Sequence, residues 1–253
     1  MPHPVPTGLF VTGTDTGVGK TAVTSAIVRI LRADGIRVGA YKPVASGAER
    51  GPTGPVWSDA EILHAALDRT FPIERICPQR FLAPLAPPVA AAEEGKRVDR
   101  ELLRSGAAWW QNQVDLLVVE GAGGLLSPIS EDDLVADLAC DLGYPLLIVA
   151  RLGLGAINHT LLTVEAAHAR GLRIAGIVMN DATAAAVEGL SPEGNPVDLA
   201  THSNPRELAK RCPVPILAVI GHSSGGDLLA GGELRRMDWS SLARRGCVQP
   251  ASE

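Results

Sequence analysis

Residues 13–21, which read GTDTGVGKT, have the composition of a loop that binds phosphate groups. The loop follows the apolar run 9–11 and precedes a segment of helical character, 22–32. Glycines allow backbone N–H groups to turn toward a polyphosphate, and the N-terminus of the next helix favours an anion. In such a loop the lysine, here Lys20, reaches the β- and γ-phosphates, and the hydroxyl of Thr21 binds Mg²⁺. The sequence therefore predicts a nucleotide-binding site.

The loop departs from the usual phosphate-binding pattern in one place. The standard spacing requires glycine at position 14, but this chain has Thr14, and its first glycine, Gly13, comes one position early. Partition-type ATPases carry a second lysine at position 14, so Thr14 also argues against that group. The sequence indicates a phosphate-binding loop of a minority type.

Three further charged residues stand near the ends of predicted strands or the start of a predicted helix. Glu120 ends the apolar run 115–120, where a carboxylate completes the Mg²⁺ site of P-loop proteins; the alternative is a solvated strand end. Lys42 follows the predicted strand 37–41 and is held extended by the next proline, which favours anion binding over an ordinary solvated lysine. Asp59 opens a helix, so it is either a metal ligand or an acid that favours the helix dipole.

Several other side chains have simpler interpretations. His159 and Asn158 stand at a predicted helix start, where we interpret the histidine as structural and the asparagine as a cap. Trp109 and Trp110 lie in the predicted helix 99–113, and we interpret them as packing or interface surface.

Composition limits the classes of function. The chain has 253 residues, 46% of them hydrophobic and 20% charged, which suits one large α/β domain or two small ones with a substantial core. A net charge of −5 argues against broad binding to nucleic acid or anionic membranes. We expect no signal peptide or membrane span. The scattered cysteines favour reduced thiols in the cytoplasm over a disulfide framework or metal site: Cys77, Cys140, Cys212 and Cys247.

Strand patterns and helix patterns alternate along the chain. The predicted strands are 9–11, 37–41, a short one at 79–82, 115–120, 145–150, 173–179 and 215–220. The predicted helices are 22–32, one that opens at residue 58 with capping-box spacing, 99–113, 132–142, 157–170, 205–211 and a weaker 234–244. The irregular segments are 44–55, 72–88, a turn at 121–129 and a long excursion at 182–204. This alternation predicts an α/β fold with a doubly wound, mostly parallel sheet and helices on both faces.

The polar motifs begin at or just beyond the carboxyl ends of these strands, where parallel sheets bind ligands. The motifs are residues 13–21, 42–47, 120–124, 154–159 and 180–181. They are therefore predicted to form one site.

Five of the short motifs resemble those of the dethiobiotin synthetases: residues 13–21, YKPVASG at 41–47, 58–59, VEGAGG at 119–124 and INHT at 157–160. The resemblance covers about 9–181, so we expect a single domain over 1–253 whose part from about 182 is divergent. It implies a homodimer and an ATP- and Mg²⁺-dependent reaction in biotin synthesis, in which CO₂ carboxylates 7,8-diaminopelargonate and the ureido ring of dethiobiotin closes. One amine becomes a carbamate, which takes the γ-phosphoryl group; the second amine attacks this mixed anhydride and releases phosphate.

The resemblance also implies a role for individual residues. Lys20 and Lys42 are implied to stabilise charge on the phosphoryl group and the carbamate. The implied Mg²⁺ ligands are Thr21, Asp59 and Glu120. The implied ATP contacts are Gly13, Thr14, Asp15, Thr16, Gly17, Val18, Gly19, Lys20, Thr21 and, for adenine, Asn180. The implied substrate contacts are Lys42, Ser46, Gly121, Leu154, Gly155 and Asn158, where 154–158 reaches the substrate of the neighbouring subunit.

Two departures from the family pattern leave questions open. Some members have Glu where this chain has Gly17, and an Ile-Pro segment beside the adenine is replaced by residues 219–222. The second departure bears on the contacts to the nucleotide base and so on nucleotide selectivity. Two other classes of P-loop protein are alternatives: a partition-type nucleotide switch, which does not need Lys42 or Ser46, and a cobyrinic-acid-type amidoligase, which usually carries an additional glutaminase domain.

Overall fold

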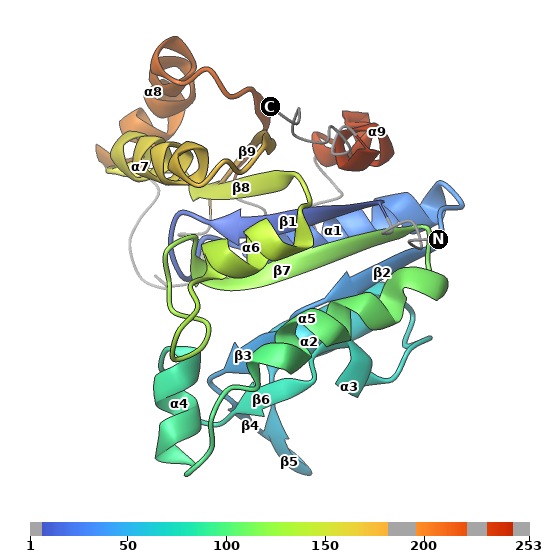
Figure 1. Cartoon of the computed structure of the whole chain (residues 1–253). Helices are drawn as coiled ribbons and strands as arrows, with labels where there is room; N and C mark the ends of the chain where they lie inside the picture. Colours follow the sequence, from blue (N-terminus) through green and yellow to red (C-terminus); the bar gives the residue numbers. More distant parts are fainter. Residues whose placement is uncertain (1–6, 182–195, 222–231, 245–253) are drawn as a thin grey trace, which may run out of the picture.

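The computed structural model describes residues 7–181, 196–221 and 232–244. Its centre is a six-stranded sheet in the order β10-β9-β8-β1-β7-β2, and every strand pair is parallel (Figure 1). The strands are β1 (Thr7–Gly13), β2 (Val38–Tyr41), β7 (Leu116–Gly124), β8 (Leu146–Arg151), β9 (Ile174–Asn180) and β10 (Ile216–Ile220). This arrangement confirms the predicted parallel sheet and places β1 between β7 and β8.

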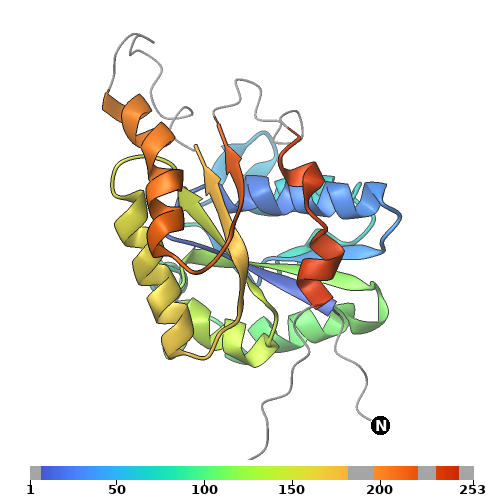
Figure 2. The same ribbon diagram turned by 90° about the horizontal axis from the view of Figure 1, so that it is seen from above.

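Helices cover both faces of the sheet, as a doubly wound fold requires. Figure 2 shows α1 (Lys20–Ala33) and α9 (Trp239–Arg244) on one side, and α6 (Val135–Leu142) and α7 (Ala156–Ala169) on the other. On the second side α5 (Arg100–Trp109) packs beside α6, and α8 (Pro196–Arg211) beside α7. The short 3-10 turns η1 (Trp110–Asn112) and η3 (Leu234–Arg236) follow α5 and precede α9.

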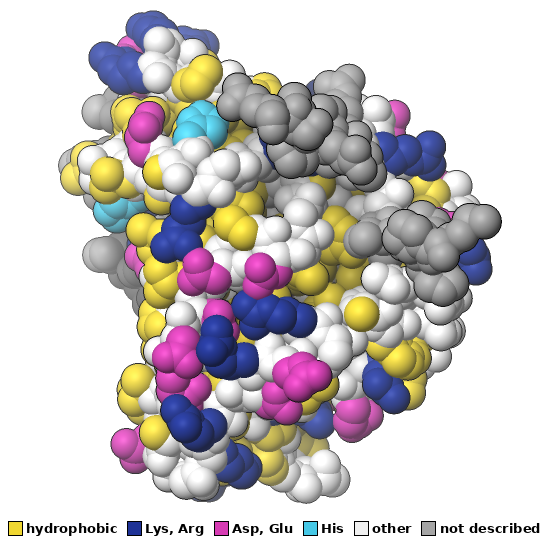
Figure 3. Space-filling model, viewed as in Figure 1, with side chains coloured by type: hydrophobic (Ala, Val, Ile, Leu, Met, Phe, Trp, Pro, Cys, Tyr) yellow, Lys and Arg dark blue, Asp and Glu magenta, His cyan; other side chains and the backbone are white. Residues whose placement is uncertain are grey.

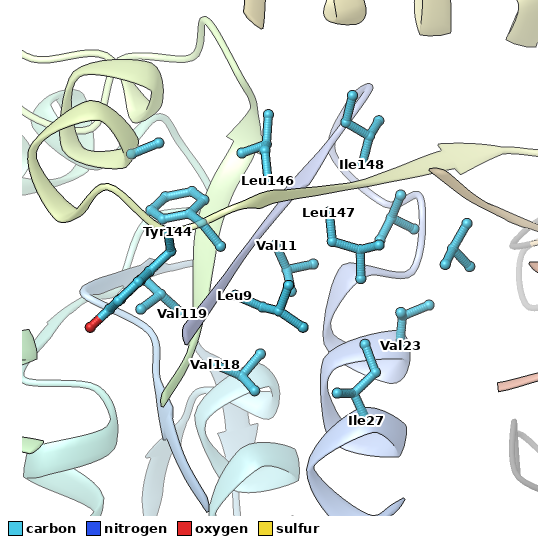
Figure 4. Close-up of a cluster of buried hydrophobic side chains, with 14 of the residues drawn as sticks. Leu9, Val11, Val23, Ile27, Val118, Val119, Tyr144, Leu146, Leu147 and Ile148 are labelled. Carbon is cyan, nitrogen blue, oxygen red and sulfur yellow. The ribbon is translucent and has the colours of Figure 1, made fainter. Parts of the chain in front are cut away.

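The core fills the space between the sheet and the helices on both of its faces, and it includes the short apolar runs of the sequence. Leu9 and Val11 of β1, neighbours from β7 and β8, and Val23 and Ile27 of α1 pack together without solvent exposure (Figure 4). Trp110 is fully buried with its ring 4.8 Å from that of Phe71, which confirms the packing interpretation of the tryptophan pair. Burying these side chains provides the main stabilisation of the fold.

The segment between β2 and α5 is more regular than the sequence predicts. It contains β3 (Val44–Ser46), β4 (Glu49–Gly51), β5 (Gly54–Val56), α2 (Ser58–Ala66), α3 (Ile73–Ile76), β6 (Gln79–Phe81) and α4 (Pro87–Glu93). The predicted strand at 79–82 is confirmed, but the predicted loop at 44–55 is wrong, because β3 pairs with the distant β6 and β4 with β5. The predicted irregular crossing at 72–88 contains α3 and the start of α4.

Two helix starts differ from prediction. The capping box at Ser58 is wrong: Trp57 is the N-cap, no side chain caps the helix, and the Glu61 carboxylate contacts Arg69 instead of a backbone N–H. Asn158 is not a cap either, because α7 begins at Ala156 and left-handed Gly155 is its N-cap. Both Asn158 and His159 are exposed on the first turns of α7.

Other element boundaries also differ. The predicted turn at 121–129 starts late, because β7 continues to Gly124, which pairs with Gly13. The predicted excursion at 182–204 is helical from residue 196, and α8 runs through Pro205; residues 182–195 lie outside the described residues. The predicted helix at 234–244 is divided in two, because the Asp238 carboxylate accepts the Ser241 N–H and starts a new helix.

No helix among the described residues is long and apolar enough to span a membrane. The cysteines that the structure describes, Cys77, Cys140 and Cys212, are free thiols; Cys247 lies outside the described residues.

Candidate active site

The loop from Gly13 to Gly19 joins β1 to α1 and passes close to neighbouring groups. Gly17 and Gly19 have left-handed backbones, with φ of 72° and 90°. A Cβ on Gly19 would lie 2.1 Å from the amide nitrogen of Asn180, and one on Gly13 would lie 2.7 Å from the Asp15 carbonyl. Only glycine fits at these two positions, and the first N–H groups of α1 have no helical acceptors.

Lys20 is the first residue of α1, and its side chain is folded back over the loop. Its Nζ donates to the backbone carbonyl of Asp15 at 2.9 Å, and only 7% of the residue is exposed. Burial lowers the pKa of Lys20 to about 8, although the nearby Glu120 carboxylate acts in the opposite direction. An anion in front of the loop would favour the charged form of this lysine.

Four side chains form a compact polar group, which we call the site cluster: Thr21, Lys42, Asp59 and Glu120. Thr21 Oγ1 lies 2.8 Å from Asp59 Oδ1 and 2.7 Å from Glu120 Oε1, and its single proton serves one of them at a time. Lys42 Nζ lies 2.5 Å from Asp59 Oδ2 and 2.6 Å from Glu120 Oε1. The backbone N–H of Lys42 donates to the Ile76 carbonyl at 2.8 Å, which fixes the end of β2.

The charges in this cluster stabilise one another. Burial alone lowers the pKa of Lys42, but attraction to Glu120 and Asp59 outweighs burial and raises it overall. Burial raises the pKa of Asp59, but the Lys42 ammonium and hydrogen bonds from Lys42 and Thr21 outweigh this effect and lower it overall. Lys42 and Asp59 are therefore an ion pair at neutral pH.

A cavity of ≈970 Å³ opens beside the loop and the cluster. It brings together many of the residues that the sequence predicted for one site: Thr16, Gly17, Gly19, Lys20, Thr21, Lys42, Ser46, Asp59 and Asn180. Glu120 is fully buried behind them and joins through its hydrogen bonds to Thr21 and Lys42. Residues far apart in sequence thus surround one cavity at the carboxyl edge of the sheet.

Other predicted residues lie outside the cavity lining. Leu154 is 94% exposed, and neither Gly155 nor Asn158 faces the cavity of this chain. Gly121 packs inward, where a Cβ would lie 2.8 Å from Val135. The described lining also leaves out four residues of the loop: Gly13, Thr14, Asp15 and Val18.

The cavity also has walls that the sequence reasoning missed. One wall is the segment Pro84, Leu85, Ala86 and Pro87, held to Ser46 by a hydrogen bond from its Oγ to the Leu85 carbonyl at 2.6 Å. The lining also includes Ser127, Pro128 and Gly221, which none of the predicted motifs contained. Ala122, Gly123 and Asp181 line it as well and belong to the predicted motifs 120–124 and 180–181. The prolines at 84 and 87 were a signal for a rigid wall, but only the distant contact with Ser46 shows which way the wall faces.

The site cluster has the donor set of a magnesium site. Mg²⁺ prefers oxygen ligands, usually one or two carboxylates together with phosphates and water. Glu120 Oε2 is buried and has no hydrogen-bond partner among the described residues, so one carboxylate oxygen remains available. No group of three or more His, Cys, Asp or Glu side chains could hold a metal within the described part of the chain. The oxygen donors of Thr21, Asp59 and Glu120 fit Mg²⁺ that is also bound by phosphate and water.

A parallel doubly wound sheet, a glycine-rich loop from its first strand to Lys20 and a buried acid within β7 define a P-loop nucleotide-binding protein of the α/β class. The structure resembles that of the cell division ATPase MinD of Pyrococcus furiosus, with a TM-score of 0.50 and 18% identity over 94% of this chain and 97% of that one. A family model described as an AAA domain matches residues 7–224.

Sequence comparison identifies the family. The chain is 46% identical over 212 residues to the ATP-dependent dethiobiotin synthetase BioD of Anaeromyxobacter sp. (strain Fw109-5), which covers 83% of this chain and 92% of that protein. It is 41% identical over 212 residues to the protein of the same name from Bacillus subtilis (strain 168), covering 84% and 86% of the two chains. The chain belongs to the dethiobiotin synthetase family.

Proposed function

We propose that this protein catalyses the ATP-dependent conversion of 7,8-diaminopelargonate and CO₂ to dethiobiotin, in biotin biosynthesis in the cytoplasm. One observation carries the proposal within this family: phosphate-binding, metal-binding and cationic groups from α1, α2, β7 and the end of β2 converge beside one cavity. The reaction joins three reactants, and a shared cavity at the sheet edge brings their reacting atoms together.

ATP occupies the loop end of the cavity in this proposal. The backbone N–H groups of residues 13–19 surround the phosphates, and Lys20 exchanges the Asp15 carbonyl for the β- and γ-phosphates. Asn180 contacts the adenine; its amide also donates to the Val18 carbonyl at 3.0 Å and ties β9 to the loop. Val219 of β10 and His222 replace the family's usual base-side segment; His222 lies outside the described residues.

Thr21, Asp59 and Glu120 hold Mg²⁺ in this proposal, consistent with the partnerless oxygen of Glu120. When bound, Mg²⁺ neutralises charge on the phosphates during transfer. The oxygen ligands come from three different elements, α1, α2 and β7. Their spacing in the fold therefore depends on the packing of α1 against α2 and β7.

The diamine lies between Ser46, Lys42 and the apolar wall at 84–87, which suits an aliphatic chain with a polar end. One amine nitrogen attacks CO₂ and loses a proton, giving a carbamate. A carbamate oxygen attacks the γ-phosphorus and ADP leaves. The second amine then attacks the carbonyl carbon and loses a proton, and phosphate leaves with the carbamate oxygen. Lys20 and Lys42 stabilise negative charge on the phosphoryl group and on the carbamate. Gly121 serves this site by letting β7 pack closely behind it.

A homodimer completes the site in this proposal. Leu154, Gly155 and Asn158 lie beyond β8 at the same edge of the sheet but outside the cavity of their own chain, so they contact the substrate of a second copy. Large exposed apolar side chains support an interface there: Leu154 is 94% exposed and Leu162 of α7 is 60% exposed.

An omission assay tests the proposed function. Purified protein with ATP and Mg²⁺ should release phosphate in step with dethiobiotin formation, and release should cease when either diaminopelargonate or bicarbonate is left out. Phosphate release that ignores both substrates and responds to a protein partner would instead favour the partition-type switch.

A further inference from the structure

Lys42 contacts both carboxylates that the proposed function assigns to Mg²⁺. Its ammonium nitrogen lies 2.5 Å from Asp59 and 2.6 Å from Glu120. Lys42 is 4% exposed and Glu120 is not exposed at all, so water contributes little to neutralising the Glu120 carboxylate. A buried carboxylate such as Glu120 requires a positive partner, and in this structure that partner is the Lys42 side chain, which also pairs with the 45% exposed Asp59.

A divalent cation on the same carboxylates competes with this lysine. If Lys42 stayed in place, three positive charges would face two negative ones within a few ångströms, and repulsion is strong where water is excluded. Lysine is a compact charge on a flexible stem, so its Nζ can move to another anion while its backbone stays in place. The adjoining cavity supplies room for such an anion, beside Ser46.

We infer that Lys42 is a displaceable cation, which neutralises Asp59 and Glu120 until a divalent metal binds and releases its ammonium group toward the substrate. The inference rests on the proposed function for the identity of the metal and the substrate. It makes metal loading and the catalytic placement of Lys42 one coupled step. By linkage, an anionic substrate that attracts Lys42 also strengthens metal binding.

Mn²⁺ titration followed by electron paramagnetic resonance tests the exchange in nucleotide-free protein. Lys42→Met should bind Mn²⁺ at least about tenfold more tightly than the wild type, the size of a typical coupling between ligands. Lys20→Met is the matched control, because it removes the same charge from the same cavity. In the wild type the Lys20 Nζ donates to the Asp15 carbonyl and to no carboxylate. Its Mn²⁺ affinity should change much less.

Thermal melting keeps the test decisive if Lys42→Met folds poorly. The variant should melt earlier than the wild type without metal, because two carboxylates lose their partner, and should regain stability with saturating Mg²⁺. Unchanged or weaker Mn²⁺ binding, an equal gain in Lys20→Met, or a variant that Mg²⁺ does not restabilise would overturn the inference. If the variants give such a result and the wild type still makes dethiobiotin, only the exchange is contradicted. If the wild type makes no dethiobiotin, the proposed function is contradicted.

Discussion

Two ionic clusters of this protein show what separates a structural charge network from a reactive one. The first is the site cluster, and the second, which we call the arginine cluster, consists of Arg100, Arg104, Ser130 and Asp133. In the arginine cluster both Asp133 oxygens have partners: Arg100 donates to them at 2.7 and 2.9 Å, Ser130 at 2.8 Å and Arg104 at 3.2 Å. The Asp133 side chain is 5% exposed. This cluster has no acceptor left for a ligand.

The site cluster is connected differently. Glu120 accepts two bonds on one oxygen and none on the other among the described residues, and the group opens on a cavity. The arginine cluster ties α5 to the segment before α6, on a face where basic and acidic side chains alternate over these helices (Figure 3). A closed network of directed bonds stabilises the fold, whereas an open network keeps charge available for chemistry.

Removing the charge of Lys20, which lies beside the site cluster, should lower the turnover number and change the free energy of unfolding little. Lys20→Ala should lower turnover about 10³-fold, because a preorganised cation that stabilises transferring phosphate is lost. Steady-state assays of dethiobiotin formation, with circular dichroism as the fold control, measure both effects. Near-normal turnover would remove Lys20 from its proposed role.

Breaking the arginine cluster should have the opposite result. Asp133→Asn should destabilise the protein by about 2 kcal/mol, because the buried carboxylate that accepts from Arg100 and Arg104 loses its charge, and should leave turnover nearly unchanged. Calorimetry should show a melting temperature lower by about 6 °C. The matched control is Asp115→Asn, whose pair with Arg37 is exposed on both sides and should contribute almost nothing. Equal melting of the two variants would contradict the comparison.

The two regions should also differ in the pH range over which their stability changes, because the Asp133 charge stabilises the fold whereas the Lys20 charge destabilises it. Arg100, with Arg104 and Ser130, outweighs burial and holds the pKa of Asp133 well below its usual range. Its stabilisation is therefore present above about pH 4, the pKa of an unfolded aspartate, and is lost as pH falls further. Burial lowers the pKa of Lys20 from 10.5 to about 8, so its charge destabilises the fold below pH 8, and that penalty disappears as pH rises to 10.5.

Melting curves across pH measure both effects as differences between variants. The stability gap between the wild type and Asp133→Asn should narrow below about pH 4. Lys20→Met should be more stable than the wild type at pH 7, and this advantage should shrink between pH 8 and 10.5. If either stability difference instead widened over its pH range, the assigned effect of that charge on folding would be wrong.

The smallest effect is expected from a substitution on the surface beyond β8. It tests whether the site cluster needs a second chain to bind substrate. Leu154→Asp should weaken the proposed dimer, because a charge would enter an apolar interface. Analytical ultracentrifugation should show more monomer, and the KM for diaminopelargonate should rise. Val89→Asp, at a 48% exposed position on α4, is the control and should change neither. A wild type that sediments only as a monomer would exclude the dimer.

The sequence predicted those parts of the site whose positions follow from local pattern and parallel topology. Lys42 follows the end of β2, Lys20 follows the loop after β1, and Glu120 lies within β7, four residues before its end. Parallel strands bring their carboxyl ends to one edge of the sheet. Asp59 had two interpretations in the sequence, as a ligand or as a helix-start acid. Only the packing of α2 against α1 places it against Thr21, 38 residues away along the chain.

The features that the sequence missed depend on pairing between distant residues. Residues 44–46 have no local strand signal strong enough to separate them from a loop. They form β3 because β6 lies beside them in the fold. The wall at 84–87 faces the cavity because Ser46 bonds its backbone. Two predicted helix caps were wrong for a related reason. The N-caps of α2 and α7 are Trp57 and Gly155, and not the polar residues Ser58 and Asn158 that follow them.

Oxygen tracing tests most directly whether the site cluster promotes attack of a carbamate oxygen on the γ-phosphate of ATP. In single-turnover reactions started with ¹⁸O-labelled CO₂, the account predicts one labelled oxygen in the released phosphate and label in the carbonyl of dethiobiotin. Phosphate that carries oxygen from water, with no label from CO₂, would contradict it.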